Sequence, residues 1–120
     1  MAIKHAAFIM YPVSDVARAG AFYEDVLGLP KSELELPFWR EYDVAGLTFG
    51  VGNFEQVGKP GSAQSLALEV DDIVATRSAL VAKGAEVSEP HELGGCFTSV
   101  VKDPDGNLVW LHQLKPERRG

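Results

Sequence analysis

Apolar and polar positions follow two different periods along this chain, and the periods come in the same order in both halves. In the first half, the apolar run from Ile3 to Tyr11 predicts a buried strand. Apolar residues then recur at helical spacing over 15–27, behind Ser14 or Asp15 as the cap, and Gly28 ends this predicted helix. Three strand-like runs follow, at 32–36, 38–44 and 47–51.

A connector rich in glycine and proline, residues 53–62, separates this half from a second series of the same kind. There Asp71 or Asp72 caps a helix that runs to Lys83 and ends at Gly84. Strands are predicted at 65–70, 85–88, 97–102 and 108–113, with a polar loop at 89–95. Both halves therefore have the order strand, helix, strand, strand, strand, which indicates one duplicated unit.

Three stretches carry a family resemblance: Tyr11 to Leu29, Leu66 to Val87, and Val101 to Gln113. With their Phe-Tyr, Leu-Gly-Leu and Asp-Pro-Asp-Gly-Asn signatures they resemble the vicinal oxygen chelate superfamily, which includes glyoxalase I, extradiol dioxygenases and bleomycin-resistance proteins. The resemblance implies a single α+β domain over 1–120, in which two tandem βαβββ modules form a cupped mixed sheet around a cleft, with helices on the outer face. The implied modules span about 3–52 and 63–114, and a polar tail follows at 115–120.

The resemblance also implies where the metal ligands of this superfamily would stand. The matching positions in this sequence hold Phe8, Phe49 or Gly50, Ser65 and Trp110. Apart from the weak ligand serine, none of these side chains binds a divalent cation. We therefore expect the usual metal site to be absent and the cleft to have an apolar, aromatic floor.

Two polar residues remain candidates for chemistry in the second half. Strand alternation puts His112 on the face of Trp110, and Glu69 on the face of Ser65 in a strand expected to be its neighbour. If Ser65 and Trp110 face the cleft, so do Glu69 and His112. The pair could form a general base with an orienting carboxylate, two ligands of a displaced metal site, or a structural hydrogen bond.

The predicted strand 38–44 could present either of two faces to the cleft. Trp39, Glu41 and Asp43 share one face and alternate with Phe38, Arg40 and Tyr42 on the other. The pattern does not decide between them, so Trp39 is a candidate ligand contact and Glu41 a candidate third metal ligand.

Composition and charge limit the kinds of partner and the cellular compartment that we expect for this protein. The 120 residues include 11 Lys and Arg against 17 Asp and Glu, a net charge of −6, which argues against nucleic acid as a partner. A single cysteine, Cys96, excludes an internal disulfide and a thiolate zinc cage. The start of the chain holds no apolar run typical of a signal peptide or membrane span, so we expect a cytoplasmic protein.

These observations favour a metal-free protein that binds a small organic molecule, with stacking surface and negative charge suited to a planar or cationic ligand. The candidate contacts are Phe8, Trp39, Phe49, Ser65, Glu69, Trp110 and His112. One alternative is a metal-dependent lyase, isomerase or dioxygenase, with Ni, Zn, Fe or Mn held by Glu69, His112 and Glu41. Another is a metal-free enzyme with His112 as the base. The resemblance also implies a homodimer, in which modules are in some cases exchanged.

Overall fold

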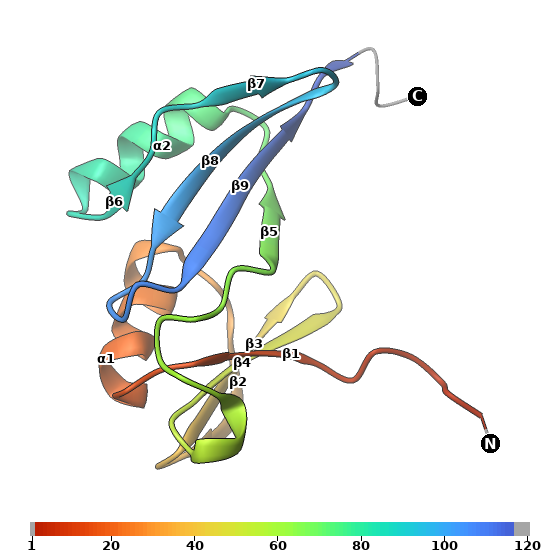
Figure 1. The fold of residues 1–120 in the computed structure, drawn as a ribbon, viewed down its shortest axis with the longest axis vertical. Coiled ribbons are helices and arrows are strands. Elements are labelled where there is room, and N and C mark those ends of the chain that lie inside the picture. Colours follow the sequence, from red (N-terminus) through yellow and green to blue (C-terminus); the bar gives the residue numbers. More distant parts are fainter. Residues whose placement is uncertain (1, 117–120) are drawn as a thin grey trace.

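The computed structural model describes residues 2–116 and contains two sheets, each covered by a helix on one side (Figure 1). The first sheet has the order β1–β4–β3–β2, made of β1 (Ile9–Pro12), β2 (Lys31–Leu36), β3 (Trp39–Val44) and β4 (Leu47–Gly52). The second has the order β5–β9–β8–β6, with β7 also paired to β8; its strands are β5 (Leu66–Glu69), β6 (Glu86–Val87), β7 (His91–Leu93), β8 (Cys96–Lys102) and β9 (Leu108–Leu114). Met1 and the end of the predicted polar tail, 117–120, lie outside the described residues.

Both helices begin at the capping acids that the sequence predicts. The helical segments are α1 (Val16–Ala21), the π-helical turn η1 (Phe22–Val26), the short turn η2 (Glu55–Val57) and α2 (Ile73–Ala82). The Asp15 carboxylate accepts the Arg18 backbone N–H at 3.0 Å, and the Asp72 carboxylate accepts that of Ala75 at 3.0 Å. Each unit therefore starts its helix in the same way, which agrees with a duplicated βαβββ unit.

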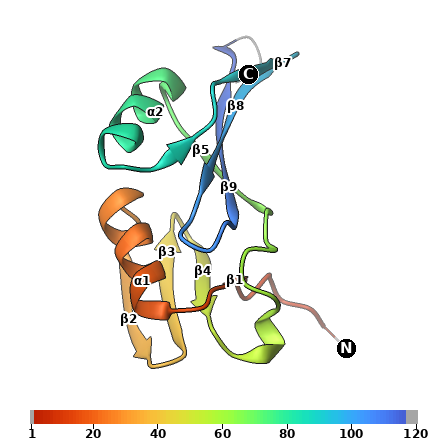
Figure 2. The same ribbon diagram turned by 60° about the vertical axis from the view of Figure 1, so that its left-hand side comes forward.

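We call β1–β4 with α1 the first module, and β5–β9 with α2 the second module. Figure 2 shows the two sheets side by side with both helices on the same side of the molecule. The Tyr11 hydroxyl links the modules, because it donates to the Leu108 carbonyl and accepts the Leu66 N–H, each at 2.7 Å. The helix-free faces of both sheets are therefore on the side opposite α1 and α2.

The core of the first module is aromatic. Phe49 is fully buried on the helix side of the sheet, with its ring centroid 5.1 Å from that of Tyr11, 5.2 Å from Tyr23 and 6.3 Å from Tyr42. Such offset and edge-on ring pairs add packing energy beyond the apolar area that they bury. Through Tyr23 this cluster packs η1, the continuation of α1, against the sheet and so determines which side chains are left for the opposite face.

The α+β class with two βαβββ modules is confirmed, while three details differ from the sequence prediction. The modules form two separate sheets rather than one continuous sheet. The first strand begins at Ile9 instead of Ile3, because its parallel partner β4 begins at Leu47 and Ile9 already pairs with Phe49. The loop predicted at 89–95 contains β7, whose backbone pairs with β8.

Residues 2–8 lie outside the sheet and are exposed, with Ile3 84% exposed. The segment runs away from the body of the molecule in Figure 1. Among residues 2–116, no helix has the length and apolar character needed to cross a membrane.

Candidate functional site

A hollow with almost entirely apolar walls lies on the helix-free face of the first module. We call it the aromatic hollow; its volume is about 470 Å³, and it is lined by Phe8, Met10, Leu34, Leu36, Phe38, Trp39, Glu41 and Phe54. Most of these apolar side chains are substantially solvent-exposed, so they form a contiguous apolar patch. Patches of this kind on a soluble protein mark binding surfaces. The volume is in the range of small-molecule sites.

The structure decides which face of β3 lines this hollow. Trp39 and Glu41 point into it, whereas Tyr42 is buried on the helix side beside Phe49. Arg40 also lies on the helix side, where its guanidinium pairs with Glu24 of η1 at 3.1 Å. The face of β3 that carries Trp39 and Glu41 is therefore the one that lines the hollow.

Trp39 forms the floor of the aromatic hollow and is held on several sides. Its indole N–H donates to the Glu41 Oε2 at 2.8 Å, and its ring meets Phe8 edge-on at a centroid distance of 5.5 Å. The indole also lies directly over Gly50, where an added Cβ would stand 2.2 Å from the ring. Gly50 is therefore the residue that makes room for the indole.

The four positions that correspond to metal ligands carry no suitable donor set. Of the two alternatives Phe49 and Gly50, Gly50 lies on the helix-free face. Phe49 is fully buried in the core, so the expectation that it contacts a ligand is wrong. The other positions hold Phe8, Ser65 and Trp110, and the Trp110 indole donates to the Gln64 carbonyl at 2.9 Å. A divalent cation needs several oxygen or imidazole donors, and these positions supply only one hydroxyl beside a phenyl ring, a glycine and an indole. Within the described residues, no group of three or more His, Cys, Asp and Glu side chains could hold a metal ion.

The second module brings Glu69 and His112 together, as the strand alternation predicts. The two residues are paired across β5 and β9, with the His112 Nδ1 2.5 Å from the Glu69 Oε1. The second Glu69 oxygen accepts the Leu114 N–H at 2.8 Å. This contact at Nδ1 fixes the orientation of the imidazole and leaves Nε2 directed away from Glu69. Glu41 belongs to the other module, so the three expected alternative metal ligands do not converge within one chain.

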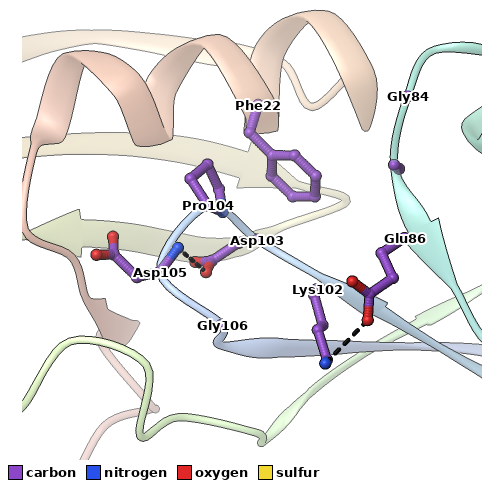
Figure 3. A pocket seen from close by; sticks show the side chains of 9 residues that line it. Phe22, Gly84, Glu86, Lys102, Asp103, Pro104, Asp105 and Gly106 are labelled. Atoms are coloured by element: carbon purple, nitrogen blue, oxygen red, sulfur yellow. Dashed lines mark hydrogen bonds and ion pairs between the residues drawn. The ribbon is translucent and has the colours of Figure 1, made fainter.

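A second hollow, of about 520 Å³, lies on the helix side between the modules (Figure 3). Its charged groups already have partners within the protein. Lys102 pairs with Glu86 at 2.9 Å, and the buried Asp103 accepts the Tyr23 hydroxyl and the Asn107 side-chain amide, each at 2.8 Å. The Asp-Pro-Asp-Gly-Asn signature therefore stabilises the contact between modules, and this hollow offers a ligand few unused polar groups.

Several residues of the aromatic hollow were not among the sequence candidates. They are Met10, Leu34, Leu36, Phe38 and Phe54. Alternation of Leu34 and Leu36 with charged residues in the run 31–36 was the available signal for β2. No sequence pattern predicts the place of Phe54, because this residue belongs to the connector and lies at the hollow only once that loop has folded.

Comparison with known proteins agrees with this geometry. The sequence profile of the glyoxalase/bleomycin resistance protein/dioxygenase superfamily matches residues 2–111. A lactoylglutathione lyase from Haemophilus influenzae is 32% identical over 92% of this chain and 93% of its own. The crystal structure of TnmS3, an antibiotic binding protein from Streptomyces sp. CB03234, has a TM-score of 0.85 and 28% identity, covering 96% of this chain and 99% of that one. A glyoxalase/bleomycin resistance protein from the same Streptomyces strain has a TM-score of 0.78 and 26% identity, covering 91% and 100%.

The profile match extends over most of the chain and agrees with both the duplicated unit and the arrangement of its strands. This chain therefore belongs to the glyoxalase/bleomycin resistance protein/dioxygenase superfamily.

Proposed function

We propose that this protein binds a small organic molecule in the aromatic hollow and does so without the metal that the family's enzymes use. The observation that carries the proposal is the aromatic hollow itself, where Trp39 covers Gly50 at one of the family's metal-ligand positions. An indole there supplies apolar contact surface in place of a carboxylate donor. Burial of a ligand's apolar area against these walls provides the binding free energy.

The relatives support two different activities, and the residues of this chain favour one of them. One related protein is described as antibiotic-binding and another as a lactoylglutathione lyase. Metal-dependent lyase chemistry needs several oxygen or imidazole donors that converge on one ion. Since Phe8, Gly50 and Trp110 supply none, binding of an organic ligand is the better match.

Fluorescence titration tests this proposal, because the chain has only two tryptophans. In a Trp110→Phe variant, Trp39 becomes the single reporter and lies in the proposed site. We expect a saturable change in its emission on addition of naphthalene derivatives. Leu34→Ser, in the wall of the hollow, is expected to weaken binding by about threefold to tenfold, from the lost burial of one aliphatic side chain.

Leu93→Ser is the matched control, since Leu93 is similarly exposed (54% against 47% for Leu34) but lies on β7 in the other module. It should leave the affinity unchanged. Absence of any saturable response in the single-tryptophan protein would contradict the proposal. Metal analysis of protein purified without chelators adds a second check, since a stoichiometric metal content would favour the metal-dependent alternative.

The Glu69 and His112 pair supports a second candidate function, in which His112 acts as a general base without metal. Glu69 would orient the imidazole through this hydrogen bond. For a substrate that is turned over, His112→Ala is expected to abolish turnover while it retains ligand affinity. Equal turnover in the variant would exclude this role.

We also propose that the protein acts as a homodimer. The helix-free faces of the two modules lie side by side in one chain, with both helices behind them (Figure 2). A second copy could cover the exposed apolar side chains of the aromatic hollow with its own second module. Light scattering should then give twice the mass of one chain.

A further inference from the structure

Glu41 is the one charged side chain in the wall of the aromatic hollow among the described residues. Its neighbours there are aromatic and aliphatic, so its charge is close to a low-polarity surface. Electrostatic attraction is stronger beside such a surface than in open water, since less solvent screens it. Because Glu41 is part of the wall, a ligand that fills the hollow must lie next to its carboxylate.

Within residues 2–116, no cationic side chain pairs with Glu41. Its Oε2 accepts the Trp39 indole N–H at 2.8 Å, and it forms no ion pair with any of residues 2–116. On the opposite face of the same sheet the arrangement differs, because Arg40 pairs with both Glu24 and Glu35. The carboxylates that Arg40 contacts on the helix side therefore have a cationic partner, whereas Glu41 on the hollow side has none among residues 2–116.

The hydrogen bond to Trp39 gives this charge a fixed position. One carboxylate oxygen is engaged by the indole, which holds the side chain against the floor of the hollow, and the second oxygen can accept a hydrogen bond from a ligand. A charged donor on the ligand would make this bond about twice as strong as a neutral one. Geometry and charge together therefore select for a cation at one end of an otherwise apolar molecule.

We propose that the ligand of the aromatic hollow is a flat apolar molecule that carries a single protonated amine, with the ammonium group beside Glu41. This inference rests on the proposed binding function and names the ligand class of the same site. The hollow's volume of about 470 Å³ accommodates a molecule of a few fused rings.

Three naphthalene probes of matched size test the charge preference. They are naphthylmethylamine, which is cationic at neutral pH, naphthalenemethanol, which is neutral, and naphthylacetate, which is anionic. With Trp110→Phe as the background, the cation is expected to bind at least about tenfold more tightly than the alcohol, and the anion most weakly. Added salt should weaken binding of the cation and leave the alcohol unaffected.

Glu41→Gln is the decisive variant, because the glutamine oxygen can still accept the Trp39 indole N–H while the charge is lost. It is expected to remove the preference for the cation and to leave the affinity for the alcohol within about twofold. Glu33→Gln is the matched control, since Glu33 is an exposed carboxylate of β2 that does not line the hollow. This control changes the net charge by the same amount and should retain the preference.

The outcomes separate this inference from the function on which it rests. Equal affinity for cation and alcohol, or a cation preference that survives Glu41→Gln, would overturn the inference while binding itself remains. Failure of all three probes to bind would overturn the proposed function as well. A preference lost in Glu41→Gln and retained in Glu33→Gln supports the cationic ligand.

Discussion

At the scale of single residues, Gly50 determines the shape of the candidate site. A Cβ at this position would stand 2.2 Å from the Trp39 indole, a distance that no relaxed structure tolerates. Gly50→Ala is therefore expected to lower the free energy of unfolding by about 1–3 kcal/mol, the usual cost of overpacking. Urea unfolding followed by circular dichroism measures this cost.

A double-mutant cycle provides the control for Gly50→Ala. In a Trp39→Ala background the clashing indole is gone, so the same glycine substitution should cost much less. If Gly50→Ala is equally destabilising in both backgrounds, its cost comes from the backbone rather than from the indole.

The position of a single side chain was predictable only where the alternation of apolar residues along a strand identified its buried face. Glu69 and His112 lie on the same face as Ser65 and Trp110 in any register that buries Leu66 and Leu111, so their shared face follows from the pattern. Their direct pairing depends in addition on the register of β5 against β9. Glu41 was different, since both faces of 38–44 carry aromatic and charged residues. Its place in the hollow depends on which face α1 covers, and that is settled by packing of distant residues.

At the scale of elements, three buried tyrosines of the first module make the stability of the protein depend on pH. Burial raises the pKa values of Tyr11, Tyr23 and Tyr42 above their ordinary value of 10.0, and the carboxylate of Asp103 raises that of Tyr23 further. In the unfolded chain these hydroxyls ionise near pH 10, whereas the folded chain keeps them protonated. Stability is therefore unaffected by these groups below pH 10 and falls above it.

Each tyrosine that ionises only on unfolding lowers the free energy of unfolding by about 1.4 kcal/mol per pH unit above pH 10. Three such groups give a slope of up to about 4 kcal/mol per pH unit. Urea titrations at several alkaline pH values measure it, and Tyr42→Phe should reduce the slope by about a third. An unchanged slope in Tyr42→Phe would show that this tyrosine ionises equally in both states.

The helices were easier to predict than the ends of the strands. Asp15 and Asp72 fix the starts of α1 and α2 through hydrogen bonds within four residues, so the sequence contains the whole cause. The start of β1 depends instead on where its parallel partner β4 begins, some 40 residues away. The strand β7 was missed for the same reason: its exposed residues have no apolar pattern, and only backbone pairing with β8 makes it a strand.

At the scale of the whole molecule, duplication predicted two similar modules but not how they sit together. Their contact depends on side chains that reach across it, such as the Tyr11 hydroxyl between Leu66 and Leu108. This contact joins the sheets side by side and leaves both helix-free faces on one side (Figure 2). In the homodimer that we propose, the partner's second module would lie over the first module and close a cleft between the two faces.

This arrangement predicts complementation between two defective variants. Leu34→Ser damages the aromatic hollow, and Trp110→Ala removes a candidate ligand contact of the second module, so each homodimer should bind the cationic naphthalene probe weakly. In a mixture unfolded and refolded together, half of the dimers contain one chain of each kind. One of the two sites in such a dimer combines an intact hollow with an intact second module. About one quarter of all sites should thus regain full affinity.

Sites built within one chain give a different result. Every chain then keeps its own defect, and the mixture binds as the simple average of the two variants with no tight fraction. The pair Leu93→Ser and Trp110→Ala serves as the control, since Leu93 lies outside the hollow and its variant should bind fully before mixing. Fluorescence titration of the mixture measures the tight fraction directly, because full-affinity sites saturate first. A tight fraction near one quarter requires that both chains contribute to each site.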